Sequence, residues 1–413
     1  MKLPRVEIPA IQNWSCHGCS DCCRGQLIIR ISAEDKARIE NQGWTKADGI
    51  DPATMMVDET GYVRLSHQSD GACVFLDSSG RCRIHSKFGE AAKPLACRLY
   101  PLVIRQVGGK LVVGMQFSCP SAAANRGKPL AERAGELQLL AREALPKDLV
   151  DDAPPPVAAA PGGEWGDFRR FVKWIDASLS ADNVPIALGL LRTLHWLHAV
   201  EKGRLDGITD EGADEILGVL SDSARGKVPG LPKDPPAPSR FGRMFFRTMV
   251  VEHARPITVD DMNMSGQYRW KMLRATLRFL PAGGRTPALR ENLKSVKFAE
   301  VEKSFGPLSA ESDAMLRRFF RVKIQSYQFC GRAFHDASLM EGFRSLALLY
   351  PIIIWLARWQ AVSDGRKQVS DDDVMRAIAM ADYHHGFSPW LRWRDKLLAQ
   401  RDDIARLCGW YAG

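Results

Sequence analysis

Cysteine is the residue whose number and spacing point most directly to chemistry in this chain of 413 residues. The chain has ten cysteines, and eight of them are concentrated near its start: Cys16, Cys19, Cys22, Cys23, Cys73, Cys82, Cys97 and Cys119. Residues 1–15 contain no apolar segment of the kind found in signal peptides. We therefore expect a cytoplasmic protein, in which clustered thiols bind a metal or an iron–sulfur cluster and do not form disulfides.

Residues 16–23, with the sequence C-H-G-C-S-D-C-C, have the most informative spacing. A C-x-x-C turn places two thiolates on one side of a tight loop, where both can reach one metal. The second step of three residues, to Cys22, repeats this geometry and matches the start of the bacterial ferredoxin run. Because adjacent side chains diverge, we expect either Cys22 or Cys23 to bind a different metal or to stay free.

The later cysteines lie in segments that favour strands and turns. Residues 73–85 are predicted to form a β-hairpin around an Asp-Ser-Ser-Gly turn, which would bring Cys73 close to Cys82. A second hairpin is predicted over 102–113, around Val-Gly-Gly-Lys. His85 follows Cys82 by three residues and is a candidate metal ligand or a hydrogen-bond donor to one.

The order of these motifs over residues 13–121 resembles a known family. C-x-x-C-x-x-C-C is followed by C-x-F-L-D-x-x-G-x-C-x-I-H and by K-P-x-x-C-R-x-Y-P, as in the CxxCxxCC cysteine-cluster family of zinc- or iron-chelating domains. The order of a cysteine-rich region and a helical region also resembles flagellin lysine N-methylase. That resemblance implies an iron–sulfur cluster, S-adenosylmethionine as cofactor and a protein substrate.

The remaining sequence predicts an α+β protein in which a larger all-α domain follows a small, cysteine-rich, β-containing domain. We expect the N-terminal domain at 1–150, a Pro- and Gly-rich linker at 151–163 and the helical domain at 164–413. A second Pro-rich stretch, 229–238, is predicted to be a loop. The expected helices are 122–150, 185–200, 241–253, 268–280, 312–330, 346–359 with Pro351 as a kink, 374–385 after a Ser370 cap, and a last one that opens at Ser388 and Pro389.

Several residues of the helical domain are expected to be structural. His195 and His198 share a helix face, but no H-E-x-x-H motif accompanies them, so packed or capped core histidines are favoured. The pair 384–385 lies at a helix end, where a cation suits the helix dipole. Cys330 and Cys408 stand alone in helical sequence and are expected to be buried apolar side chains that bind no metal.

The net charge of +9 is spread along the chain, so a nucleic-acid partner is not expected. The apolar run 345–357 is too short to span a bilayer, so a membrane is not expected either. One stretch is distinctly basic and forms a solvated helix face or a surface for an acidic partner, a phosphate or a cofactor carboxylate. Its basic residues are Arg240, Arg243, Arg247, Arg255, Arg269, Lys271, Arg274, Arg278, Arg285, Arg290, Lys294 and Lys297.

The absence of several well-known motifs reduces the number of enzyme classes to consider. It contains no strand-associated G-x-G-x-x-G, no phosphate-binding P-loop, no G-x-S-x-G elbow and no C-x-x-x-C-x-x-C of the radical S-adenosylmethionine enzymes. Two interpretations remain. The chain is a cluster-containing methyltransferase that modifies a protein lysine in a groove with Tyr268, Trp270 and Tyr327 as candidate residues, with no catalytic residue assigned. Alternatively, it is a zinc- or iron-binding structural or partner-binding module, or an iron–sulfur redox protein.

Overall fold

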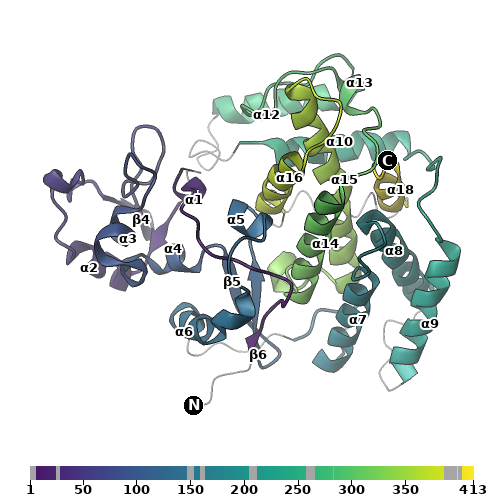
Figure 1. Ribbon diagram of the computed structural model, residues 1–413, viewed down its shortest axis with the longest axis horizontal. Coiled ribbons are helices and arrows are strands. Elements are labelled where there is room, and N and C mark those ends of the chain that lie inside the picture. Colours follow the sequence, from purple (N-terminus) through teal and green to yellow (C-terminus); the bar gives the residue numbers. More distant parts are fainter. Residues whose placement is uncertain are drawn as a thin grey trace.

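The architecture is α+β, as the sequence predicts: a small strand-containing part is followed by a larger helical part (Figure 1). The computed structural model describes residues 6–24, 28–146, 153–158, 163–203, 212–256, 266–281, 283–385, 398 and 402–413. All strands of this described set lie before residue 116, and the later named elements are helices.

The strands form two small three-stranded sheets. In one sheet, β1 (Val6–Glu7) is parallel to β6 (Lys110–Met115), which pairs antiparallel with β5 (Leu102–Val107). In the other, β4 (Tyr62–Leu65) lies between β2 (Arg30–Ile31) and β3 (Met56–Glu59). The predicted hairpin over 102–113 is confirmed, and its turn needs glycine because Gly108 and Gly109 have φ angles of 56° and 74°.

The helices of the N-terminal part are short. They are α1 (Asp21–Arg24), α2 (Ala33–Glu40), α3 (Arg83–Phe88), α4 (Leu95–Leu99), α5 (Pro120–Ala123) and α6 (Ala134–Ala144), with the 3-10 turns η1 (Lys46–Asp48), η2 (Glu90–Ala92) and η3 (Leu130–Arg133).

The helices of the C-terminal part are longer and pack around a central apolar helix. They are α7 (Trp165–Ser178), α8 (Ile186–Gly203), α9 (Gly212–Lys227), α10 (Arg240–Ala254), α12 (Gly266–Phe279), α13 (Phe298–Val301), α14 (Ala310–Gln325), α15 (Leu339–Ser363), α16 (Asp371–His384) and α18 (Asp403–Trp410), with the 3-10 turn η4 (Arg332–Phe334).

The central helix α15 is long and apolar enough to cross a membrane by length and composition alone. However, 89% of its most apolar window is buried inside the fold, as in the core helix of a folded domain. Pro351 lies inside this helix and does not end it.

Buried side chains form two separate hydrophobic cores. The smaller core belongs to the N-terminal part and contains Ile31, Ile39, Trp44, Ile50, Met55, Leu65, Phe75 and Ile84. The larger core joins β5, β6 and α6 to the C-terminal helices, and Figure 1 shows β5 and β6 between the cysteine-bearing segments and these helices. The predicted domain boundaries at 150 and 163 stay a prediction.

Several predicted elements differ from the structure. The hairpin over 73–85 is wrong: the chain makes a single bridge between Leu76 and Cys82 and then enters helix α3. In the described part of 122–150, α-helix is found in the end of α5 and in α6, and the helix predicted over 312–330 ends with α14 at Gln325. The last predicted helix, opening at Ser388, lies outside the described residues.

Two Pro-rich segments have different structures. Residues 229–238 form a loop between α9 and α10, as predicted. Within the predicted linker, the described residues 153–158 are held against the start of α15. Pro156 and Val157 accept hydrogen bonds from the amides of Leu339 and Met340 through their carbonyl oxygens, at 2.8 and 3.0 Å.

Candidate metal centre

All eight N-terminal cysteines line one cavity of about 680 Å³. They arrive from four chain segments: the 16–23 motif, the 73–82 turn, helix α4 and the start of α5. None of these thiols is in a disulfide. The structure therefore gathers the full set of predicted site residues, Cys16, Cys19, Cys22, Cys23, Cys73, Cys82, Cys97 and Cys119, around a shared space.

The 16–23 motif is shaped by a tight turn into helix α1. Ser20 accepts hydrogen bonds from the amides of Cys23 and Arg24 through its carbonyl oxygen, at 2.8 and 2.9 Å. Gly18 has a φ angle of 67°, a left-handed conformation that glycine adopts without strain. The sulfur atoms of Cys22 and Cys23 lie 3.9 Å apart at the end of this turn.

A backbone hydrogen bond ties this motif to the next cysteine segment. The amide of Cys73 donates to the carbonyl oxygen of Cys23 at 2.7 Å. Because this bond joins two segments that are fifty residues apart in sequence, it fixes Cys73 beside the 16–23 motif. The adjacency of these thiols is thus built into the backbone.

A carboxylate-centred turn positions Cys82. The Oδ1 atom of Asp77 accepts hydrogen bonds from the Ser79 amide, the Ser79 hydroxyl and the Arg81 amide, at 2.9, 2.7 and 2.9 Å. Aspartate favours such turns because its short side chain can bond to the backbone that follows it. Cys82 then lies directly before helix α3, at its N-cap.

Helix α4 carries Cys97 and is attached to helix α2. The carboxylate of Asp35 accepts hydrogen bonds from the amide of Leu95, the first residue of α4, at 3.1 and 3.3 Å. Cys119 is the N-cap of α5, where Pro120 occupies the first turn. Both cysteines therefore sit at or near the start of short helices that the surrounding fold holds in place.

Burial and the neighbouring thiols raise the pKa values of several of these thiols. The pKa of Cys73 rises to about 11 through loss of solvent, with smaller contributions from Cys82 and Cys22. Desolvation also raises the pKa of Cys97, and Cys73, Cys82 and Cys22 act in the same direction. For Cys22, the hydrogen bond with Cys23 is the main cause, followed by desolvation. A bound metal cation reverses this balance because it stabilises the thiolate form.

The electrostatic couplings define an inner set of thiols, and Cys22 links this set to Cys23 and to Cys19. Cys73 and Cys97 each interact with Cys82 and Cys22, so these four form an inner set: Cys22, Cys73, Cys82 and Cys97. Cys19 interacts with Cys16 and Cys22, and Cys119 interacts with Cys19. Cys16 and Cys19 are exposed, whereas the inner set is half-buried.

The donor atoms of the cavity fit a soft metal. Thiolate ligands are suited to zinc and to iron–sulfur clusters, and here eight thiols surround one space. Within the described part of the chain, no three side chains of Cys, His, Asp or Glu form a group close enough to hold a single ion. The assignment of individual thiols as ligands stays a prediction.

The cavity also contains residues that the cysteine spacing does not reveal. His67 pairs with Cys73 in an isolated bridge, and His17 and His85 also line the cavity. Tyr100 donates or accepts a hydrogen bond with the Ser118 hydroxyl at 3.2 Å, and burial raises its pKa. Tyr383 reaches the cavity from helix α16. Of these residues only His85 was predicted as a candidate. His17 and Tyr100 lie inside the cysteine motifs, and His67 and Tyr383 lie outside them.

Other candidate residues lie away from this cavity. Tyr268 and Trp270 belong to α12, and Tyr327 packs against Phe168 with ring centroids 5.5 Å apart. Cys330 and Cys408 are buried in the main core, as predicted. The methylase groove that would use the three aromatic residues stays a prediction.

Two predictions about histidine pairs need correction. The expectation that His195 and His198 are core residues is wrong, because His195 is exposed and His198 lies 3.9 Å from the Glu201 carboxylate. His384 and His385 do end a helix, but desolvation lowers both pKa values well below 6.5. These two imidazoles are therefore neutral at neutral pH and do not act as dipole-stabilising cations.

Comparison with known families agrees with the geometry of the cysteine-lined cavity. Residues 15–120 match the family model CxxCxxCC, whose description is "Putative zinc- or iron-chelating domain". The match covers about a quarter of the chain, the segment that contains all eight N-terminal cysteines. None of the curated proteins and none of the solved structures matches this chain. The match supports metal chelation by the N-terminal part, with zinc and iron as the two metals that the description names. The resemblance to flagellin lysine N-methylase stays a prediction.

Proposed function

We propose that the CxxCxxCC domain holds an iron–sulfur cluster on the inner set of thiols. The observation that supports this proposal is the convergence of all eight N-terminal cysteines on one cavity. Cys22, Cys73, Cys82 and Cys97 are the preferred ligands because Cys73 and Cys97 interact electrostatically with each other, and each of them also interacts with Cys82 and Cys22. Four thiolates are the common ligand set of [2Fe–2S] and [4Fe–4S] clusters.

The size of the cavity favours a polynuclear centre over a single zinc ion. Four thiolates bind zinc at about 2.3 Å, so the whole site is compact. The thiols here surround a space of about 680 Å³, and they come from four separate chain segments. A cluster of several iron and sulfide ions would use more of that space than one ion.

The remaining thiols are candidates for a second metal or for regulating access to the first. Cys16 and Cys19 line the cavity and are exposed. Cys23 lies beside Cys22, and Cys119 is near enough to Cys19 to interact with it. A bound cluster would supply one-electron transfer or structural stability, with its reduction potential set by burial and by hydrogen bonds to sulfur.

Protein lysine methylation with S-adenosylmethionine is a second candidate function. The observation that favours it is the spare volume of the cavity, because pockets of about 300–1,000 Å³ are typical of small-molecule sites. In this reaction the unprotonated lysine amine attacks the sulfonium methyl group. The carbon–sulfur bond breaks, and S-adenosylhomocysteine and a proton are released. Alignment of the two reactants would be the main contribution of the protein.

Anaerobic purification and spectroscopy test the proposed cluster. We expect a brown protein with broad visible absorption and with both iron and acid-labile sulfide bound, because thiolate-bound iron is coloured and zinc is not. A colourless protein that contains stoichiometric zinc would overturn the cluster proposal. Calorimetric titration of the cluster-loaded protein with S-adenosylmethionine tests the second candidate separately. Micromolar binding, about 8 kcal/mol, is expected for a methylase, and absence of heat would reject it.

A further inference from the structure

Helix α12 exposes an apolar ridge that is unusual for this protein. Trp270, Leu273 and Leu277 are 63%, 47% and 55% exposed. They are three of the seven large hydrophobic side chains that are exposed in the described part of the chain. Their spacing of three and four residues places them on one side of the helix, whereas Ala275 and Phe279 on another side are buried.

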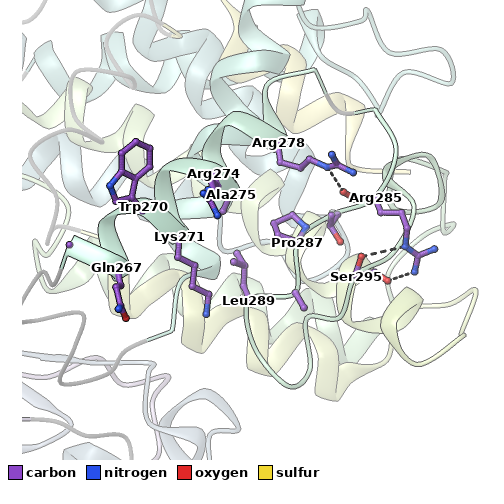
Figure 2. A pocket seen from close by; sticks show the side chains of 13 residues that line it. Gln267, Trp270, Lys271, Arg274, Ala275, Arg278, Arg285, Pro287, Leu289 and Ser295 are labelled. Atoms are coloured by element: carbon purple, nitrogen blue, oxygen red, sulfur yellow. Dashed lines mark hydrogen bonds between the residues drawn. The ribbon is translucent and has the colours of Figure 1, made fainter.

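A basic hollow lies directly beside this ridge. Figure 2 shows side chains from α12 and from the loop that follows it around a space of about 1000 Å³. Its cationic lining consists of Lys271, Arg274, Arg278 and Arg285. Trp270 stands at one end of this lining, so it belongs both to the hollow and to the ridge. The ridge and the hollow together are called the α12 face below.

The cations of the α12 face are not neutralised by the residues that the structure describes. Neither helix α12 nor the described lining of the hollow contains an acidic residue. Arg278 donates one hydrogen bond to the carbonyl oxygen of Arg285 at 3.1 Å. Arg285 donates to the hydroxyl and carbonyl oxygens of Ser295. Because a guanidinium carries five N–H donors, both arginines keep donors for a ligand.

We propose that the α12 face binds an acidic, amphipathic segment of a partner protein. Carboxylates of that segment would enter the hollow, where arginine can hold them with two parallel hydrogen bonds. Its apolar side chains would cover the ridge, as in other complexes of a helix lying in a groove. The cationic hollow calls for acidic side chains in the partner, and the apolar ridge calls for apolar side chains beside them.

A protein segment explains the α12 face better than a membrane or a nucleic acid does. A flat anionic membrane could cover the ridge but would not fill a concave space of about 1000 Å³. A single-stranded nucleic acid could place phosphates in the hollow and stack a base on Trp270. It would leave Leu273 and Leu277 exposed, because aliphatic side chains provide no stacking surface.

Fluorescence anisotropy with a labelled synthetic helix tests this inference. The probe carries glutamate on one face and leucine on the other, and the comparison peptide carries glutamine in place of glutamate. We expect saturable binding of the glutamate peptide that weakens as salt screens the charges. We expect at least about tenfold weaker binding of the glutamine peptide. Absence of saturable binding by the glutamate peptide would overturn the proposal.

Two variants of the full chain locate the binding site. Arg274→Glu reverses one charge in the hollow, and Trp270→Ala truncates the ridge; each is expected to weaken binding about tenfold, since buried Trp and Arg dominate interface energies. Arg142→Glu on α6 is the matched control, because it makes the same charge change at an exposed site. Equal binding by all three variants would reject the α12 face.

Oligothymidylate and phosphatidylglycerol vesicles are the competing probes. Tighter binding of either one than of the glutamate peptide, lost in Arg274→Glu, would replace the protein segment with that class of partner. All residues of the α12 face lie outside the cysteine-lined cavity. We therefore expect the variants to keep the metal content of the natural chain, which also shows that they are folded.

Discussion

At the scale of single residues, chemistry that depends on local spacing can be predicted, and chemistry that depends on the fold cannot. The cysteines were identifiable because the turns that position them are encoded nearby: Gly18 in the first motif and Asp77 in the turn before Cys82. Tyr383 joins the same cavity only because α16 packs against α5. No pattern around Tyr383 in the sequence signals a metal site.

The inner set of thiols gives a prediction for single cysteines. Cys97→Ser is expected to remove most of the iron and the visible absorption, because a serine oxygen is a poor ligand for a metal that prefers thiolate. Iron, sulfide and absorbance per protein molecule are the measurements. The bonds that attach α4 join the Asp35 carboxylate to the Leu95 amide and do not involve the Cys97 side chain. Substitution of Cys97 therefore leaves these bonds intact.

Two buried cysteines provide the matched control. Cys330→Ala and Cys408→Ala remove thiols that lie in the main core and do not line the cavity. Both variants should keep full iron content even where core truncation lowers their stability. Undiminished iron in Cys97→Ser, or a loss of iron in a folded Cys408→Ala, contradicts the ligand assignment.

At the scale of elements, the long helices and the Ser370 cap were predicted correctly, whereas the type of the short element after Cys82 was not. The Ser370 cap of α16 is confirmed: its hydroxyl accepts from the Asp373 amide at 3.3 Å, and Asp373 accepts from the Ser370 amide at 2.8 Å. The short segment that follows Cys82 has a composition typical of a strand. Its local sequence therefore predicted the second strand of a hairpin. Packing of Ile84 into the small core and a stop at Gly89 make it a helix.

Removal of the α16 cap should be measurable as lost stability. Ser370→Ala deletes a side chain that bonds both to the Asp373 amide and to its carboxylate, the latter at 2.8 Å. Loss of a serine N-cap typically costs about 1 kcal/mol of free energy of unfolding. Urea denaturation followed by circular dichroism measures this difference.

An exposed serine in another helix separates capping from the general effect of serine. Ser223→Ala lies in the exposed interior of α9. Because alanine has the higher helix propensity, this variant should be as stable as the natural chain or more stable by a few tenths of a kcal/mol. Equal destabilisation by the two substitutions would show that the cap contributes nothing.

At the scale of the whole molecule, a buried ion pair connects the N-terminal strands to the C-terminal helices. Lys323 on α14 lies 2.5 Å from Asp382 on α16 and donates to the carbonyl oxygen of Met115 at 3.0 Å. The carboxylate of Asp382 also accepts from the Phe117 amide at 2.6 Å. Met115 and Phe117 lie shortly before Cys119, so these bonds attach the segment that leads to Cys119 to α14 and α16. Removal of one partner of the pair would leave the other charge buried and unpaired. Composition and helical periodicity predicted both parts of the molecule but carry no information about this contact.

The two histidines at the end of α16 give a prediction for the pH dependence of stability. Desolvation is the main cause that lowers the pKa values of His384 and His385 well below 6.5. His253, Arg255 and Arg290 act in the same direction on His384, and Lys323, His253 and His335 do so on His385. Against these, the backbone bond between His384 and the carbonyl oxygen of Arg255 favours protonation.

The folded protein therefore keeps both imidazoles neutral at pH values where the unfolded chain protonates them. Below about pH 6.5 the unfolded state binds more protons, so the free energy of unfolding falls by about 1.4 kcal/mol per pH unit for each such histidine. Above that pH neither state binds these protons, and the two residues add no pH dependence.

Urea denaturation at a series of pH values measures the slope of the free energy of unfolding against pH. His384→Gln keeps a polar side chain but has no titrating group, so this variant should reduce the slope by about one proton. The control is His195→Gln at an exposed position, which should leave the slope unchanged. A slope in His384→Gln equal to that of the natural chain would mean that the burial of His384 does not control acid stability.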